Sequence, residues 1–400
     1  MREMLHTVAG FVLGIVLLPV LISAGLGGRI RGRSIIAVGP EPLISNVYNV
    51  LALRKIGYEA VSFVTHTYFI TDQFDRNFFR RRSGWRTLDR LLSSILAQCW
   101  VLWNARTVYF FFNGGPFGRI PVLRSVEPAL YRLAGVKTVV MPYGGDVQDL
   151  TRSRNLLFKH AMAIDYPASR FERKRVAERI DRWIRHADAV VAGVEWVDYL
   201  YFWSHLSVAY FSIDLDRIDV IRNGCEKREG DAKRIRVLHA PNHRAIKGTE
   251  AIVKVVGELN GEGIDVELVL IEKVSNAELL ERIAECDIVA DQLIIGWYAM
   301  FAIEGMAMEK PVVCHVREDL EQFYQDASVL EEGDLPLVKA SPSTVKEELR
   351  KLCEMSGEHR REIGRAGRRY VEKYHSLDGV GKFFAGVNSD IGIEPVAEGK

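Results

Sequence analysis

The segment DIVADQLIIGWYAMFAIEGMAMEKPVVCHV, residues 287–316, decides the fold class. An apolar run that begins at Ile288 ends at Asp291, and apolar residues then recur at helical spacing around Glu304. Pro311 ends this helix, and the valine-rich run after it has the composition of a buried strand. The order strand, loop, helix, strand predicts parallel strands in an open α/β sheet.

Glu304 is the candidate functional residue of this segment. A carboxylate near the start of a helix, facing the loop at the carboxyl end of a strand, lies where open α/β sheets bind ligands. Its two oxygens can accept both hydroxyl groups of a ribose. The alternative is a solvated helix glutamate, and position alone favours that plainer role.

Length and composition narrow the class of protein. The 400 residues exceed what one hydrophobic core normally supports, so two domains are expected. A net charge of +1 predicts no general binding of polyanions, and no nucleic-acid motif is present. The five cysteines include no CxxC pair or Cys/His cluster, which predicts neither a zinc site nor a disulfide framework and fits a reducing compartment.

The N-terminal segment is predicted to be a membrane anchor over residues 1–33. Val8 to Leu26 is almost wholly apolar and long enough to cross a bilayer. The arginines that follow, from Arg29 to Arg33, favour keeping the body of the protein on the cytoplasmic side of an inner or plasma membrane. A cleaved signal peptide, with small residues at Ser23 to Gly25, is the competing interpretation.

Residues 74–90, FDRNFFRRRSGWRTLDR, combine arginines with Phe78, Phe79 and Trp85. Arginine with exposed aromatic residues suits an anionic membrane interface. RNA binding and a solvated basic loop are the alternatives.

The first half of the chain predicts a parallel sheet. A strand at 35–38, a helix around Val50 and a strand at 60–64 form a βαβ unit, and no GxGxxG motif follows Gly39, so a dinucleotide cofactor is not expected. A later strand leads into Tyr143-Gly144-Gly145-Asp146, where glycines would let a ligand approach the backbone. Asp146 could position a sugar hydroxyl or cap the next helix.

The second half repeats this pattern after a polar boundary at 223–233. Strands and helices alternate again from Val237, which predicts a second doubly wound sheet. Lys247, at a helix start, is a candidate anion site, and a surface lysine is the alternative. Asp214 and Asp216 are interpreted as turn residues, so no metal site is predicted.

These pieces together resemble a known family. HAPNHRAIKGT, DIVADQL and GWYAMFAIEGMAMEKPVV resemble the nucleotide-binding half of retaining GT-B glycosyltransferases, the family that includes bacterial mannosyl- and glucosyltransferases of lipopolysaccharide, capsule and glycolipid synthesis. YGGDV, RHADAVVAG and YHSLDGV are similar to further segments of that family, so the resemblance spans residues 34–384. It implies an N-terminal Rossmann-like acceptor domain over 34–222, a C-terminal nucleotide-sugar-binding domain over 223–384 facing it across a cleft, and a polar tail over 385–400.

The resemblance also implies roles for individual residues. Lys247 matches the lysine that holds the donor diphosphate, and Glu304 matches the second of two glutamates, the one that binds the nucleotide ribose. Gly296 stands where the first glutamate would contact the donor sugar, and Pro241 stands where an arginine is common. The implied donor-binding residues are His239, His243, Arg244, Lys247, Gly248, Gly296, Phe301, Ala302, Ile303 and Glu304, of which the first three would supply the missing positive charge. The implied acceptor side is Gly39, Tyr143, Gly144, Gly145 and Asp146.

The expected function is transfer of a hexose from a nucleoside diphosphate sugar, as co-substrate, to a membrane-linked or polysaccharide acceptor with retention. Lys247 and Glu304 would be its catalytic residues, with no metal and no separate cofactor. The alternatives are a catalytically silent GT-B protein that binds a nucleotide or a partner at the membrane, and an epimerase acting on nucleotide sugars.

Overall fold

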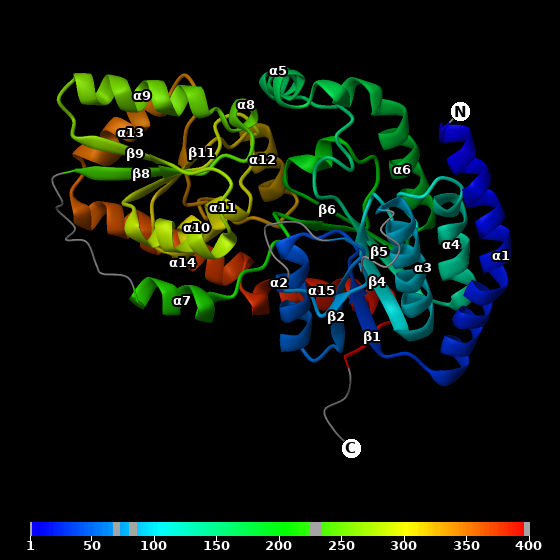
Figure 1. Ribbon diagram of the computed structural model, residues 1–400. Coiled ribbons are helices and arrows are strands. Elements are labelled where there is room, and N and C mark those ends of the chain that lie inside the picture. Colours follow the sequence, from blue (N-terminus) through cyan, green and yellow to red (C-terminus); the bar gives the residue numbers. More distant parts are fainter. Residues whose placement is uncertain (1, 67–72, 80–85, 225–233, 396–400) are drawn as a thin grey trace.

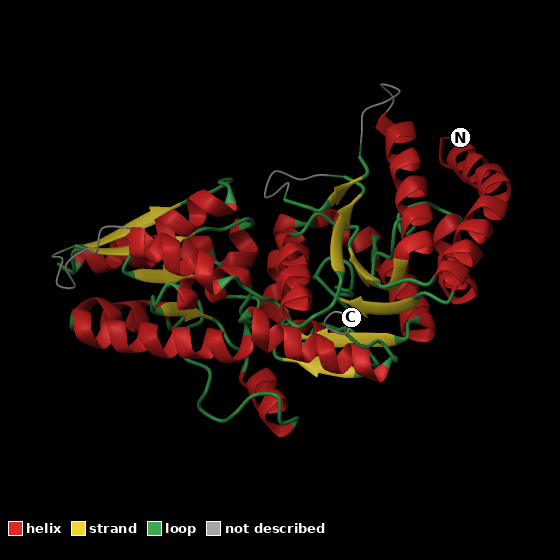
Figure 2. Cartoon of the chain, turned by 90° about the horizontal axis from the view of Figure 1, so that it is seen from below, coloured by secondary structure: helices red, strands yellow, loops and turns green. Residues whose placement is uncertain are grey.

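The computed structural model describes residues 2–66, 73–79, 86–224 and 234–395. These residues form two lobes that lie side by side, each built on a parallel sheet (Figure 1). The view from below shows the same two lobes, with helices on both faces of each sheet (Figure 2). The predicted α/β class with two doubly wound sheets is therefore what the chain adopts.

The first lobe contains a sheet of seven described strands in the order β3-β2-β1-β4-β5-β6-β7, all parallel. Valine, isoleucine and phenylalanine fill these strands because both faces of the sheet are covered by helices. The strands are β1 (Ile35–Val38), β2 (Ala60–Val64), β3 (Arg76–Asn77), β4 (Ala105–Phe111), β5 (Lys137–Met141), β6 (Ala189–Gly193) and β7 (His205–Ser207). The helices of this lobe are α1 (Arg2–Arg31), α2 (Ile44–Lys55), α3 (Arg86–Asn104), α4 (Leu123–Ala134), α5 (Leu156–Asp165), α6 (Arg173–His186) and the 3₁₀ helices η1 (Pro167–Phe171) and η2 (Val194–Asp198).

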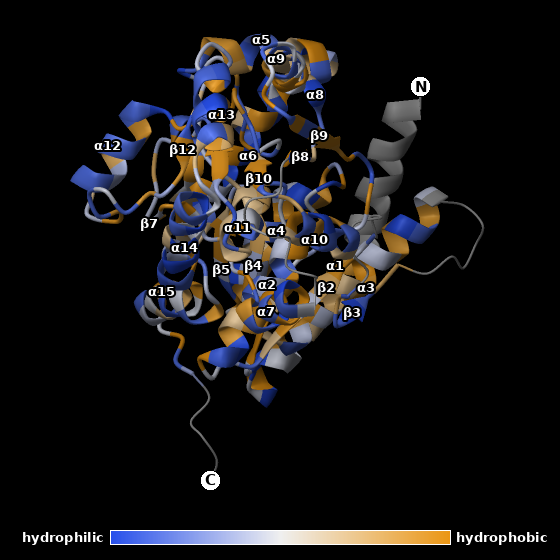
Figure 3. Cartoon of the chain, turned by 90° about the vertical axis from the view of Figure 1, so that its left-hand side faces the viewer, coloured by the Kyte–Doolittle hydropathy of each residue, from blue (hydrophilic) through white to orange (hydrophobic). Residues whose placement is uncertain are grey.

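The second lobe contains a sheet of five described strands in the order β12-β11-β10-β8-β9, also parallel. In Figure 3 its outer helices carry hydrophilic turns toward solvent, while β9 beneath them is largely hydrophobic. The strands are β8 (Ile235–His239), β9 (Val266–Leu270), β10 (Ile288–Ala290), β11 (Val312–Cys314) and β12 (Val338–Lys339). The helices are α8 (Arg244–Lys247), α9 (Thr249–Gly261), α10 (Asn276–Glu285), α11 (Met300–Ala307), α12 (Glu318–Asp326), α13 (Val345–Glu354) and α14 (Gly357–Tyr374).

The chain passes between the lobes more than once. The helix α7 (Leu215–Gly224) leads from the first lobe, and the last helix α15 (Leu377–Asp390) returns to pack against α2 (Figure 1). Helix α5 reaches in the other direction, because Phe158 and Met162 share a core with Ile246 of α8. Asp165 Oδ2 accepts the backbone N–H of Ile246 at 2.8 Å, so polar contacts join the lobes as well.

The structure contradicts the predicted transmembrane anchor. Among the described residues, no helix is long and apolar enough to cross a bilayer. Helix α1 instead packs along α3 and α4, with Leu21 buried and Gly27 too close to the Trp103 ring for a larger residue. Arg33 then fastens the end of the helix, donating to the carbonyl oxygens of Ala134 and Leu102 at 2.6 and 2.5 Å. The described part of this helix thus packs against other helices of the first lobe.

The basic and aromatic segment at 74–90 is partly accounted for by packing. Residues 80–85, including Trp85, lie outside the described part of the chain. The Phe78 ring lies 5.8 Å from that of Trp100, and the Arg76 guanidinium lies 5.1 Å from the Trp100 ring centre. Phe78 is therefore held against the lobe, in place of the exposed aromatic residue that was predicted.

Candidate functional site

The carboxyl edge of the second sheet collects the predicted donor residues. Strands β8 and β10 are adjacent and parallel, with Val289 paired to Leu238, so the chain leaves both strands at the same edge. The segment after β8 carries Lys247, and the segment after β10 carries Asp291 and leads to Glu304.

Lys247 is held against a buried carboxylate at this edge. Its Nζ donates to Asp291 Oδ1 at 2.6 Å, and the two side chains are 12% and 0% exposed. Asp291 Oδ2 is buried and forms no hydrogen bond with any described residue. The following Gly248 has φ +74°, and a Cβ atom there would lie 3.0 Å from Leu293, so the turn that orients Lys247 requires glycine. The ammonium group is thus held in place by a buried ion pair.

Glu304 is the second predicted donor residue, and it is buried. It is 2% exposed and accepts a hydrogen bond from Asn276 Nδ2 at 2.7 Å. Burial raises the pKa of Glu304 to about 7, against the opposing effects of Asn276 and Arg217, and the charge of Asp291 raises it further. The charge of Asp291 therefore acts on both Lys247 and Glu304, which come from different elements, and Glu304 is not a solvated helix residue.

Helix α11 begins at this edge, one residue before the predicted start at Phe301. Its N-cap is Ala299, whose methyl group cannot satisfy the free amides of the first turn. Phe301, Ala302 and Ile303 are buried, so their amides lie in a sheltered environment. The start of this helix can accept an anionic group.

The three residues expected to supply extra positive charge are otherwise engaged. His239 is buried, with Nδ1 2.8 Å from Ala290 O and Nε2 2.9 Å from Thr249 Oγ1, and burial lowers its pKa to about 4. It is therefore neutral at neutral pH. His243 contacts the Tyr166 hydroxyl, and Arg244 pairs at the surface with Glu250 at 2.8 Å.

Arg317 fills the space beside Gly296. Gly296 has φ +96°, and a Cβ atom there would lie 2.6 Å from Arg317 Cδ, so no glutamate fits without displacing the arginine. Arg317 Nη1 bonds Asp198 Oδ2 of the first lobe at 2.6 Å, and Arg317 is only 10% exposed. An ion pair between the lobes thus occupies the space that a side chain at position 296 would need.

At the carboxyl edge of the first sheet, Asp146 organises the strand ends. Its Oδ2 accepts the backbone N–H of Phe112 at 2.9 Å, and its Oδ1 accepts those of Tyr143 and Gly144 at 2.9 and 3.0 Å. Burial raises the Asp146 pKa to about 7, although these hydrogen bonds oppose the shift. The carboxylate holds a turn, and it neither caps a helix nor presents a free oxygen. Gly39 packs against Phe63, whose carbonyl oxygen would lie 2.1 Å from a Cβ atom there.

A pocket of about 470 Å³ opens beside these strand ends, and its chemistry was missed by sequence reasoning. Tyr143 and Gly145 line it, as does Asn113, whose Nδ2 bonds the Tyr143 hydroxyl at 2.8 Å. We call it the arginine pocket because its other lining residues include Arg119, Arg124, Arg175, Arg179 and Arg182. Arg175, Arg179 and Arg182 recur at helical spacing along α6, and that spacing is a signal which the sequence itself contains.

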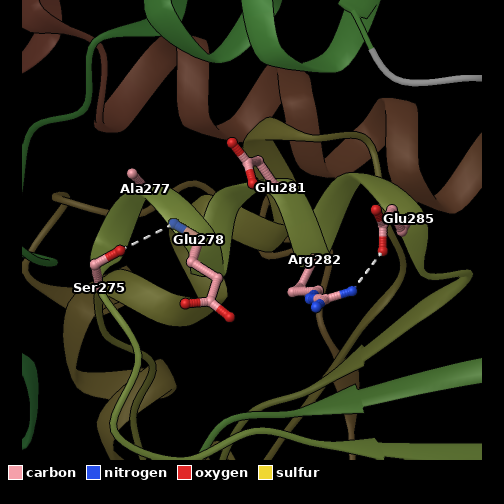
Figure 4. A pocket seen from close by; sticks show the side chains of 6 residues that line it. All are labelled: Ser275, Ala277, Glu278, Glu281, Arg282 and Glu285. Atoms are coloured by element: carbon pink, nitrogen blue, oxygen red, sulfur yellow. Dashed lines mark hydrogen bonds and ion pairs between the residues drawn. The ribbon is translucent and has the colours of Figure 1, made fainter.

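A second hollow, of about 560 Å³, runs along one side of α10 and shows no functional arrangement (Figure 4). Its side chains come from successive turns of one helix. Ser275 caps the Glu278 N–H at 3.3 Å, and Arg282 pairs with Glu285 at 3.3 Å. Within the described ranges, no three His, Cys, Asp or Glu side chains are arranged to hold a metal ion. Asp214 and Asp216, interpreted as turn residues, lie at the start of α7, where Asp214 Oδ1 accepts the Arg217 N–H at 3.3 Å.

Comparison with known proteins relates the chain to others by fold. No family model and no curated protein matches the sequence. Among solved structures, Anabaena Alr3699/HepE in complex with UDP matches with a TM-score of 0.53 and 13% identity, covering 89% of this chain and 99% of that one. WaaG, a glycosyltransferase involved in lipopolysaccharide biosynthesis, matches with a TM-score of 0.51 and 11% identity over 88% of this chain and 99% of that one. A putative UDP-N-acetylglucosamine 2-epimerase from Listeria monocytogenes also has a TM-score of 0.51, with 12% identity over 90% and 96%.

These matches show a GT-B-like fold whose structural neighbours include glycosyltransferases. At 9–13% identity across the similar structures, they show the fold alone, and that fold also serves the epimerase. Function must therefore be argued from the residues at the two sheet edges.

Proposed function

We propose that this protein is a glycosyltransferase that moves a hexose from a nucleoside diphosphate sugar to an acceptor, with retention at the anomeric carbon. One observation carries the proposal. Lys247 forms an ion pair with the buried Asp291, and the charge of Asp291 raises the pKa of the buried Glu304, so one carboxylate at the carboxyl edge of the second sheet interacts with both residues. Open α/β sheets bind nucleotides at such an edge.

The residues have complementary tasks in this reaction. As the bond from the anomeric carbon to the leaving phosphate breaks, negative charge develops on the diphosphate. Lys247 and the amides at the start of α11 stabilise that charge more strongly in the transition state than in the ground state, which lowers the barrier. Glu304 accepts the ribose hydroxyls and so fixes the nucleotide. The acceptor hydroxyl attacks from the face of the leaving group.

We also propose that the acceptor is membrane-linked and that the protein works at the cytoplasmic face of an inner or plasma membrane. Exposed apolar side chains support this on α5 and η1, where Leu156 and Phe171 are 76% and 71% exposed. Arg170 lies next to Phe171, with its guanidinium 4.6 Å from the ring centre. Apolar side chains flanked by arginine suit a lipid interface. Replacing Leu156 and Phe171 with serine should abolish sedimentation with anionic vesicles, and unchanged sedimentation would contradict this part of the proposal.

A catalytically silent nucleotide-binding protein is the second candidate, and two observations favour it. Lys247 is already paired with Asp291, and Arg317 occupies the place of a donor-contacting glutamate. Thermal-shift titration with UDP, GDP and ADP, followed by donor turnover with and without acceptor, separates the possibilities. A transferase binds one nucleotide and consumes its sugar conjugate. Binding without turnover identifies the silent protein, and reversible conversion of donor without acceptor identifies an epimerase.

A further inference from the structure

The arginine pocket carries more positive charge than its surroundings neutralise. Its lining includes five arginines but only two carboxylates, Glu172 and Glu178. Arg175 pairs with Glu172 at 3.3 Å, and Arg119 donates three hydrogen bonds to Glu41 at 2.7, 2.9 and 3.1 Å. Neither of these contacts involves the other three arginines.

Arg124, Arg179 and Arg182 form no ion pair with any residue that the structure describes. Arg179 donates to the side-chain oxygen of Asn113, which is a neutral partner. Burial, and then the neighbouring charge of Arg124, lower the pKa of Arg182, although Glu127 and Glu178 act in the opposite direction. The charges therefore repel one another across the pocket.

The fold adds to this positive potential. Helices α4 and α6 each precede a strand of the same parallel sheet, so both begin at the carboxyl edge where the pocket opens. They have 12 and 14 residues, and neither N-cap residue, Val122 or Glu172, makes a side-chain capping bond. The positive ends of two helix dipoles therefore face the same space as the unpaired arginines.

We propose that the arginine pocket binds the acceptor through a phosphate or diphosphate group, so that the acceptor is a phosphorylated sugar or a lipid phosphate. One guanidinium group can donate two parallel hydrogen bonds to the oxygens of a phosphate. A phosphate with two negative charges matches the unpaired arginines better than a single carboxylate does. About 470 Å³ holds a phosphate with an attached sugar ring. Tyr143 and Gly145 border the pocket at the strand ends, on the side predicted to receive the acceptor. The inference rests on the proposed transferase function and specifies its second substrate.

The test uses the full chain with its nucleotide site filled. Inorganic phosphate is titrated by calorimetry in the presence of saturating UDP, GDP or ADP, whichever binds. We expect the double variant Arg124→Gln/Arg182→Gln to weaken phosphate binding by at least about tenfold, since two charge-assisted contacts are lost. Lys174→Gln removes a charge from the exposed side of the same helix and should change binding less than about twofold. The melting temperature of the double variant should equal or exceed that of the parent, because mutual repulsion is relieved.

The outcomes separate this inference from the proposed function. If no nucleoside diphosphate binds, the transferase proposal fails. If a nucleotide binds but phosphate does not, or if the double variant and Lys174→Gln bind phosphate equally, the acceptor inference fails. Two further arms identify the source of the phosphate. Competition by glucose 6-phosphate supports a soluble acceptor, and arginine-dependent binding to vesicles of phosphatidylcholine with 20% phosphatidic acid supports a lipid phosphate. Failure of both arms would overturn the proposal.

Discussion

The carboxyl edges of the two sheets are built on opposite principles. At the second sheet, Lys247 is paired with the buried Asp291, and Glu304 is buried beside Asn276. At the first sheet, the arginine pocket is open, and three of its arginines form no ion pair with the residues that the structure describes. The second edge is organised before any ligand arrives, because burial fixes its few charges. The first edge retains positive charge that a ligand could neutralise. For a transferase, this difference implies that the nucleotide site is fixed before binding. It also implies that the acceptor site attracts its ligand by charge.

The largest expected effect tests the buried pair. Lys247→Ala should reduce glycosyl transfer by at least about 100-fold, because the developing phosphate charge loses its ammonium group. It should also reduce the free energy of unfolding by about 3 kcal/mol, because Asp291 remains buried without its partner. Urea denaturation and initial rates measure the two effects.

The matched variant for that pair is Lys247→Met/Asp291→Asn. It should recover most of the stability and none of the transfer, because it removes both charges from the buried site. Transfer by this double variant would show that the second edge does not stabilise the leaving phosphate through Lys247.

The buried state of Glu304 predicts a pH dependence of stability. Its pKa of about 7 in the folded chain, against 4.5 ordinarily, corresponds to up to about 3 kcal/mol. Because the folded chain holds the proton more tightly, this contribution is full below pH 4.5 and is lost as pH rises to 7. Glu304→Gln should therefore be more stable than the parent at pH 8 and similar to it at pH 4.5. If the free energies of unfolding of Glu304→Gln and the parent differ by the same amount at both pH values, the Glu304 side chain lies in a less buried site.

The same residue distinguishes ribose binding from phosphate binding. Glu304→Gln should weaken UDP binding by about 2 kcal/mol, or roughly 30-fold, because a carboxylate accepts two hydroxyl groups better than an amide. Pyrophosphate affinity should not change. Glu281→Gln, in the hollow of α10, is the control and should leave both affinities unchanged. An equal loss for UDP and pyrophosphate would contradict the ribose role.

The smallest expected effect concerns the ion pair between the lobes. Gly296→Ala should destabilise the chain by about 1–2 kcal/mol, because it introduces a Cβ atom 2.6 Å from Arg317 Cδ at a positive φ. Gly257→Ala in α9 meets no atom within 4 Å and should stabilise by about 0.5–1 kcal/mol. If both substitutions stabilise, Arg317 is not held against Gly296.

Particular elements show what could be predicted. The strands at 35–38 and 60–64 have the predicted bounds, because apolar runs between turn residues and helical stripes are local features of a chain. The location of Glu304 on the helix that follows a strand end was also predictable from the sequence. The roles of Asp146 and His239 were not, because both depend on hydrogen bonds to the backbone of other segments.

The prediction of a membrane anchor was wrong for a related reason. Apolar length is the same in a helix that faces lipid and in one that covers other helices, and only the contacts of α1 with α3 and α4 distinguish them. Gly296 raised a similar question. The resemblance implied that a donor-contacting glutamate is replaced here by glycine, but only the fold showed that Arg317, paired with Asp198, occupies the adjoining space.

By itself, the sequence determined the alternation of strands and helices, the two parallel sheets and the strand ends that Lys247 and Glu304 follow. These follow from hydrophobic periodicity and from chain direction, which act over a few residues at a time. Only the tertiary structure decided which charges are paired. Asp291 neutralises Lys247 across 44 residues, and the charge of Arg124 on α4 lowers the pKa of Arg182 on α6. Electrostatic energy depends on distance and burial in three dimensions, and neither quantity can be read along a chain.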